Sequence, residues 1–254
     1  MARMKKQILT ALFTGACICL AGFGAKAQVK ILPYGDSVTS FGSAPESSYR
    51  YWLFVDLTNA GYVFQQDFVF VGTHSGTQDG PPQNNWPAEQ YSGDGGETSL
   101  SPLSPGSGDY APDVANQTQP DIVLLDFGSN DFGNWDLGTT RTNLDATIED
   151  IRAVNPNVVV LIAKPTGWED TDPGARKFMS QLSATVGQVA KDEKKAGANV
   201  IAVNLFGGYN VRKDTKDGTH PNVIGEQLIA KKYFAALKGV LKKDFDITPQ
   251  RRRR

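Results

Sequence analysis

A serine, a histidine and an aspartate stand in this sequence where they could act together on an ester. Ser37 ends the run Gly35-Asp36-Ser37 directly after an apolar stretch, and Asp217 precedes His220 by three residues. An imidazole can take the proton of a serine hydroxyl, and a carboxylate bonded to the ring holds the required tautomer. These residue types at this spacing predict acyl transfer, with Ser37 as nucleophile, His220 as general base and Asp217 as its orienting partner.

The choice of base is narrow because the chain has only two histidines, His74 and His220. Pro221 suits the first position of a helix, which places His220 at a helix entrance. His74 lies in a Gly/Ser-rich stretch and is interpreted as a surface residue near the substrate. Ser37 has a second interpretation, since serine and aspartate are favoured at helix N-caps.

Two further runs offer donors for the oxyanion, the charged oxygen that forms when a serine attacks an ester. In the run 128–131, Asn130 carries an amide that can donate to an oxyanion, although Asn and Asp also suit plain polar turns. The backbone N–H of Ser37 is another candidate. The glycines of 92–96 let the backbone approach a ligand closely, but a flexible turn is their commoner meaning.

The elements that must position these residues alternate along the chain. Strands are predicted at 29–32, 68–71, 122–127, 158–163 and 200–206, and helices at 49–60, 140–154, 175–195 and 223–241. Strands that are apolar throughout, separated by amphipathic helices, indicate a parallel sheet covered on both faces. We therefore expect a single-domain three-layer α/β/α sandwich with a central parallel sheet of about five strands.

Ligands of such sheets bind beyond the carboxyl ends of the strands. The runs from Gly35 and Gly128 follow the first and third predicted strands, and the run 217–221 leads into the last helix. All three are therefore expected at one edge of the sheet. Residues 72–119 are rich in Gly, Pro, Ser and Asn without a sustained period, and so long a region usually carries function.

These three runs, in this order, resemble the blocks of the SGNH (GDSL-like) hydrolase superfamily. The first block corresponds to 35–37, the third to 128–131 and the last to 217–221. Residues 49–57 and 67–72 further resemble acetyl esterases of carbohydrate esterase family three. The resemblance spans essentially the whole mature chain, and it implies an SGNH hydrolase, flavodoxin-like fold.

The second block departs from those relatives, which usually have His-x-Gly followed by an aromatic residue. Here the corresponding run is Tyr91-Ser92-Gly93-Asp94, so the resemblance implies Gly93 as a further oxyanion donor, with Gly95 and Gly96 left open. The implied function is a serine esterase that removes short acyl groups, above all acetyl, from carbohydrate. The alternatives are a lipase or thioesterase acting on longer acyl esters and a non-catalytic glycan-binding relative.

Substrate contacts are expected from Asp36, Tyr91 and Trp168. Tyr91 and Trp168, together with Trp86 and Trp135, lie in predicted loops and could stack on sugar rings. Covering the edge of the sheet is an equal interpretation for these aromatic side chains.

The sequence lacks the motifs of other hydrolase classes. The Gly-x-Ser-x-Gly elbow of α/β-hydrolases and the His-Glu-x-x-His zinc motif are both absent. The run Glu169-Asp170-x-Asp172 could hold calcium, but a solvated turn is the commoner meaning because calcium needs 6–8 oxygen ligands. We expect no metal and no cofactor.

The first 27 residues have the layout of a secretory signal peptide: a basic start, an apolar run over 8–24 and the small-x-small pattern Ala25-Lys26-Ala27. The apolar run is short for a membrane span. Both cysteines, Cys17 and Cys19, lie in this segment, so the mature chain has no thiol. A lipoprotein anchored at Cys17 is the minor alternative.

Three regions are therefore predicted: a signal peptide over 1–27, the hydrolase domain over 28–246 and a basic tail over 247–254. Cleavage removes four basic and no acidic side chains, which takes the net charge from −1 to −5. A mildly acidic protein gives no reason to expect nucleic acid as a partner. We expect a secreted or periplasmic monomer with no stable membrane insertion, acting on acetylated polysaccharide or oligosaccharide.

Overall fold

The computed structural model of the chain describes residues 28–42, 48–76, 87, 90–168 and 172–249. Five parallel strands form one sheet in the order β2-β1-β3-β4-β5. The strands are β1 (Val29–Gly35), β2 (Phe68–Phe70), β3 (Ile122–Asp126), β4 (Val159–Lys164) and β5 (Asn199–Asn204). The predicted single-domain sandwich around a five-stranded parallel sheet is confirmed.

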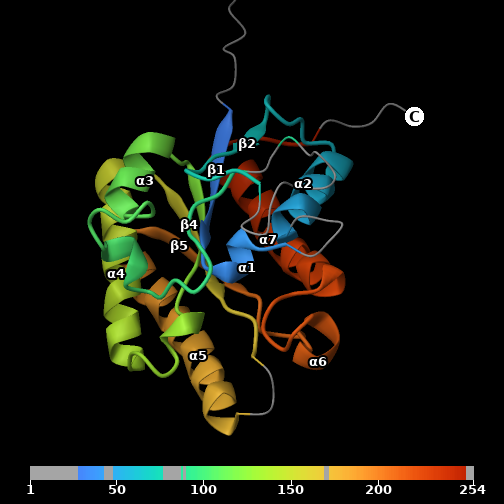
Figure 1. Cartoon of the computed structure of the whole chain (residues 1–254). Coiled ribbons are helices and arrows are strands. Elements are labelled where there is room, and N and C mark those ends of the chain that lie inside the picture. The colour runs from blue at the N-terminus through green and yellow to red at the C-terminus, as the bar shows by residue number, and fades with distance from the viewer. Residues whose placement is uncertain (1–27, 43–47, 77–86, 88–89, 169–171, 250–254) are drawn as a thin grey trace, which may run out of the picture.

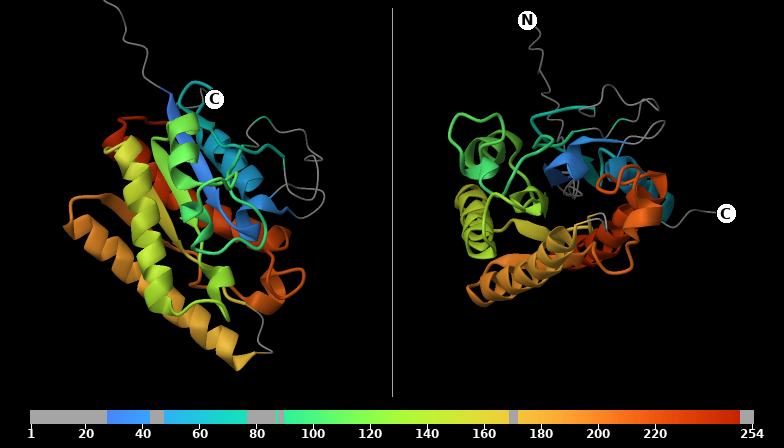
Figure 2. Two further views of the ribbon diagram at one scale, coloured as in Figure 1. Left: turned by 60° about the vertical axis from the view of Figure 1, so that its left-hand side comes forward. Right: turned by 60° about the horizontal axis from the view of Figure 1, so that its bottom comes forward.

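Helices cover both faces of the sheet (Figure 1). One face carries α2 (Ser48–Ala60) and α7 (Val223–Asp244), and the other carries α3 (Ala111–Thr118), α4 (Leu137–Val154) and α5 (Pro173–Lys195). Helices α4 and α5 lie side by side along their face (Figure 2). The short helices α1 (Ser37–Ser40) and α6 (Val211–Asp214) lie at the end of the sheet where the strands have their carboxyl ends (Figure 1).

The central strands are buried because their successive side chains enter two different cores. In β1, Ile31 packs with the core under α2 and α7, whereas Leu32 packs with the core under α3, α4 and α5, and both are 0% exposed. All five residues of β3 are buried. Because a hydrophobic core covers each face of the sheet, the side chains on both faces are apolar. The sequences of these strands are therefore continuous apolar runs.

Strand β5 differs from this pattern because it is an edge of the sheet. Val200 and Val203 are buried, at 2% and 5% exposed, whereas Ile201 is 37% exposed. An edge strand has one hydrogen-bonded neighbour, so part of its surface faces water. The prediction of a strand here is confirmed.

Within the long region 72–119, the structure adds two elements that periodicity did not reveal: α3 and a 3₁₀ turn at Ser101–Leu103. Helix α3 has eight residues, with proline in its first turn, and buries Val114 and Ala115. So short an amphipathic segment leaves too few apolar positions for the helical period to stand out.

Helix α7 begins at Val223, as predicted, with Asn222 as the N-cap that accepts hydrogen bonds from Ile224 and Gly225. Pro221 therefore lies before the helix and is not its first residue, contrary to the expectation from the sequence. Ile247 is 2% exposed in the core, and its N–H donates to Leu241 O. The domain therefore continues past residue 246.

The predicted signal peptide with both cysteines and the run Arg251–Arg254 lie outside the described residues. Within the described ranges, every helix is too short or too polar to cross a lipid bilayer.

Candidate active site

Ser37 lies on the sharp turn that joins β1 to α1. A Cβ on Gly35 would lie 2.5 Å from Thr39 Oγ1 and 2.7 Å from the Asp126 carbonyl, so only glycine fits at the end of β1. Asp36 follows as the N-cap of α1, its carboxylate accepting the Val38 N–H at 3.0 Å. The turn leaves Ser37 at the first position of α1, 6% exposed.

The backbone N–H of Ser37 is the open donor of this turn. The next N–H groups of α1 bond to Asp36: Val38 to its carboxylate, Thr39 and Ser40 to its carbonyl. Ser37 N–H has no hydrogen-bond partner among the described residues. The first N–H groups of a helix have no intrahelical acceptor, so this group can serve an oxyanion at the nucleophile.

His220 and Asp217 form a tightly bonded pair on the loop that leads into α7. Asp217 Oδ2 lies 2.7 Å from His220 Nδ1, and Oδ1 accepts the backbone N–H groups of His220 at 2.7 Å and Thr219 at 3.0 Å. Partial burial would raise the pKa of Asp217, but these hydrogen bonds, first that of the His220 ring, bring it below its ordinary value. The charged carboxylate thus fixes the ring and leaves Nε2 as the nitrogen that can act as a base.

The ring of His220 is also held from the side of the nucleophile. Phe41, the C-cap of α1, packs against it with ring centroids 5.0 Å apart. Ser37 and His220 line one small crevice together with Phe41, Lys216 and Glu226. No hydrogen bond joins the Ser37 hydroxyl to the His220 ring among the described residues, as is common in hydrolases without substrate.

Asn130 reaches the same turn from the carboxyl end of β3. It lies in the 3₁₀ turn Ser129–Asp131, and its Nδ2 donates to Glu97 O at 2.8 Å and lies 3.5 Å from Asp36 Oδ2. Asp131 anchors this turn, accepting the Ser99 N–H at 2.8 Å and the Thr140 hydroxyl at 2.6 Å. The amide of Asn130 is therefore held beside the residue that precedes Ser37.

Gly93 lies against the same strand end, but its N–H points elsewhere. A Cβ on Gly93 would lie 2.0 Å from Gly35 O, so the close approach of the two chains requires glycine. The Gly93 N–H donates to Asp109 Oδ1 at 2.8 Å. In this arrangement it is not offered to an oxyanion, and the predicted role of Gly93 stays a prediction.

Two carboxyl groups are buried together beneath the nucleophile turn. Asp36 is 1% and Asp126 is 2% exposed, and the Asp36 N–H donates to Asp126 O at 3.2 Å. Burial raises the pKa of Asp126 to about 7, and burial together with the Asp126 charge raises that of Asp36 well above its usual range. The pair therefore holds on to a proton at pH values where exposed aspartates are ionised.

The side chains predicted to contact substrate differ in how far they are exposed to solvent. Asp36 is buried as the cap of α1, and Tyr91 is 3% exposed, with Arg50 lying 4.1 Å from its ring centroid, so neither presents a side-chain surface to a sugar. Trp168 lines a cavity of about 530 Å³ with Tyr209. Trp135 is 39% exposed. Trp86 lies outside the described residues.

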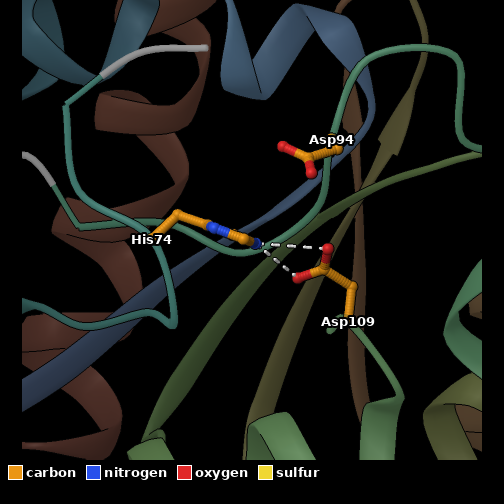
Figure 3. Close-up of side chains that lie close together, drawn as sticks. All are labelled: His74, Asp94 and Asp109. Carbon is orange, nitrogen blue, oxygen red and sulfur yellow. Dashed lines mark hydrogen bonds and ion pairs between the residues drawn. The ribbon is translucent and has the colours of Figure 1, made fainter. Parts of the chain in front are cut away.

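A hydrogen-bonded cluster next to Gly93 was not predicted from the sequence. His74 is not a plain surface residue, because its Nε2 lies 3.1 Å from the buried Asp109 carboxylate, with Asp94 close by (Figure 3). Among the described residues, these three form a group of side chains suited to hold a metal ion. No short motif links them, since they are spread over thirty-six positions of a region without periodicity.

The comparison with protein families decides the class of the chain. Residues 34–228, which include the nucleophile turn, Asn130 and the His220 loop, match the model of the GDSL-like Lipase/Acylhydrolase family. The chain belongs to this family. Membership confirms the predicted class of enzyme, a carboxylic ester hydrolase.

Relatives of this GDSL-like hydrolase include a "Multidomain esterase" of Ruminococcus flavefaciens, 27% identical over 237 residues. The alignment covers 86% of the GDSL-like hydrolase but only 29% of that relative.

Solved structures confirm the fold of the GDSL-like hydrolase. A carbohydrate esterase family 3 protein from Talaromyces cellulolyticus has a TM-score of 0.73 at 21% identity, covering 87% of this chain and 100% of that one. The family 3 carbohydrate esterase of Clostridium thermocellum has a TM-score of 0.69 at 26% identity, covering 85% and 98%. Axe2, an acetylxylan esterase from Geobacillus stearothermophilus, has a TM-score of 0.59 at 18% identity, covering 90% and 99%.

Proposed function

We propose that this GDSL-like hydrolase is a secreted serine esterase that removes acetyl groups from carbohydrate through an acyl-enzyme intermediate. The observation that carries the proposal is the pairing of His220 Nδ1 with Asp217 Oδ2 at 2.7 Å, beside the crevice that His220 shares with Ser37. A carboxylate-bonded imidazole next to a serine at a helix start is the arrangement that serine hydrolysis needs.

In the proposed mechanism, His220 Nε2 takes the proton of the Ser37 hydroxyl as its oxygen attacks the ester carbonyl. Asp217 stabilises the imidazolium that results. The proton then passes from His220 to the departing alcohol, leaving an acetyl group on Ser37. Water that gives its proton to His220 attacks this acyl-enzyme, and acetate leaves as the Ser37 oxygen regains a proton.

The oxyanion is assigned first to the Ser37 N–H and the Asn130 amide. The Ser37 N–H has no acceptor among the described residues, so it can serve an oxyanion without rearrangement. The Asn130 amide is held beside Asp36 and donates to Glu97 O, so it must turn from that carbonyl to reach the oxyanion. Gly93 would join them only after its N–H leaves Asp109.

An acetylated carbohydrate is proposed because several proteins with this fold are named for such substrates. They include two family 3 carbohydrate esterases and an acetylxylan esterase. The crevice around Ser37 and His220 is narrow, which suits a small acyl group better than a long chain.

The test is acetate release from acetylated xylan and from other acetylated polysaccharides. We expect turnover by the wild type and a loss of at least about 10⁴-fold in kcat for Ser37→Ala, with an unchanged Tm. Ser180→Ala, on the exposed surface of α5, is the matched control and should keep full activity. An active Ser37→Ala protein would overturn the assignment of the nucleophile.

Acyl chain length tests the substrate class separately. We expect p-nitrophenyl acetate to be hydrolysed with a much higher kcat/KM than p-nitrophenyl palmitate. A preference for the long chain would make the enzyme a lipase-type member of its family. Binding to polysaccharide without turnover of any short ester would make it a non-catalytic glycan binder.

A further inference from the structure

Three segments that are distant in the chain meet at His74, Asp94 and Asp109. His74 follows β2, Asp94 lies in the turn after Gly93, and Asp109 precedes α3. One potential ligand atom from each residue lies within 4.8 Å of the others. His74 Nε2 is 3.1 Å and 3.3 Å from the two Asp109 oxygens, as the dashed lines in Figure 3 mark.

These spacings suit a small divalent cation bound by nitrogen and oxygen. Ligand atoms about 2.0–2.1 Å from a tetrahedral zinc ion lie about 3.3–3.4 Å from each other. The separation of His74 Nε2 from Asp109 Oδ2, 3.3 Å, already has this value. The carboxylate of the half-buried Asp94 has an oxygen within 4.8 Å of the other two ligand atoms, and it must move closer to bind the same ion.

The surroundings of Asp109 resemble the outer shell of a metal ligand. Its Oδ1 accepts the Gly93 N–H at 2.8 Å and lies 3.3 Å from the Thr73 hydroxyl, which fixes the plane of the carboxylate. Its Oδ2 has His74 as its one hydrogen-bond partner among the described residues. Hydrogen bonds that orient a ligating carboxylate in this way are typical of metal sites.

The local charge also favours a cation. Ligand atoms of Asp94 and Asp109 lie within 4.8 Å of a ring nitrogen of His74, and the Glu97 carboxylate accepts the Asp94 N–H at 3.0 Å. In the described part of the chain, no lysine or arginine forms an ion pair with these three acids. A divalent ion would neutralise this excess negative charge.

We propose that His74, Asp94 and Asp109 form a zinc site, with water as the fourth ligand. The site is distinct from the proposed triad, which needs no metal. Zinc there ties the segment after β2 to the turn after Gly93 and to the start of α3. Because the Gly93 N–H is bonded to Asp109, the ion also fixes the stretch of chain that lies against the end of β1.

The test is zinc binding by the untagged full chain, measured by isothermal titration with zinc chloride and by Tm. We expect one equivalent of zinc and a Tm raised by several degrees, since a ligand of the folded state stabilises it. His74→Gln keeps a donor for Asp109 but cannot ligate zinc as imidazole does, and it should weaken zinc binding at least about 100-fold. Asp94→Asn should weaken it at least about tenfold.

Matched controls make the location unambiguous. The chain has two histidines, so His220→Gln, which removes the imidazole of the proposed triad, should leave zinc binding unchanged. Asp113→Asn removes an exposed carboxylate of α3 and should also leave it unchanged. Zinc binding that is lost with His220 and kept with His74→Gln would overturn the proposal. So would tighter binding of calcium chloride than of zinc chloride, or the absence of saturable zinc binding. None of these readouts depends on esterase activity, so failure of the site and failure of the proposed function are separable.

Discussion

The two halves of the candidate active site are built in opposite ways. The nucleophile half rests on the buried end of the sheet, where Ser37, Asp36 and Asp126 are all at most 6% exposed. The acid–base half is on a surface loop, where the side chain of His220 is 23% and that of Asp217 is 46% exposed. Burial at the end of the sheet holds the first half in place, whereas hydrogen bonds within four residues, together with Phe41 packed on the His220 ring, hold the second.

The two halves therefore affect the free energy of unfolding differently. A buried carboxyl without compensating charge destabilises the fold, so the nucleophile turn lowers the stability of the protein. The loop pair is exposed, and exposed charge pairs contribute little to stability. Substitutions in the loop should therefore change activity alone, and substitutions under the nucleophile should change stability as well.

Asp217→Asn gives the largest expected effect and tests the loop half. The amide cannot hold the His220 tautomer or stabilise its charge, so kcat should fall about 10⁴-fold while the free energy of unfolding changes by less than about 1 kcal/mol. The pKa of Asp217 is already below its ordinary value, so the carboxylate is charged above about pH 4 and the loss should be the same from pH 5 to 9. Steady-state kinetics and urea unfolding measure both quantities. A kcat within tenfold of the wild type would show that Asp217 does not orient the base.

Asp126→Asn tests the buried half through stability. A carboxyl whose pKa is higher in the folded than in the unfolded chain stabilises the fold when protonated, and that advantage is lost as pH rises from about 4 to about 7. At about 1.4 kcal/mol per pKa unit, the cost to the wild type above pH 7 is on the order of 4 kcal/mol. The variant cannot ionise, so it should match the wild type near pH 4 and exceed it in stability at pH 8.

Urea unfolding of both proteins across this pH range measures the effect. Asp113→Asn, an exposed aspartate, should show no such pH-dependent difference. Parallel curves for Asp126→Asn and the wild type would mean that the buried pair carries no ionisation cost.

The same contrast explains what the sequence reveals. The loop pair is predictable because Asp217 and His220 are three residues apart, and the sheet is predictable because its strands are apolar throughout. The contacts of Asp109 and Glu97 are not predictable, because they join segments through a region without periodicity. Tyr91 shows the same limit: its sequence neighbours indicate a loop, but only the packing of Arg50 on its ring shows that it is buried.

Asn130→Ala is expected to give the smallest of these effects. It tests the oxyanion donor that lies beside the nucleophile turn. Its amide bonds to Glu97 O, beside the buried Asp36, yet it is assigned to stabilise an oxyanion that forms only during the reaction. Losing one such donor costs about 3 kcal/mol, a hundred- to a thousand-fold in kcat, with little change in KM. Asn130→Asp keeps the size, loses the donor and adds a negative charge, so it should lose more than the alanine variant. Asn116→Ala, an exposed amide on α3, is the control. A larger loss for alanine than for aspartate would mean that Asn130 acts through packing of the turn, because only a donor role makes the charge of aspartate harmful.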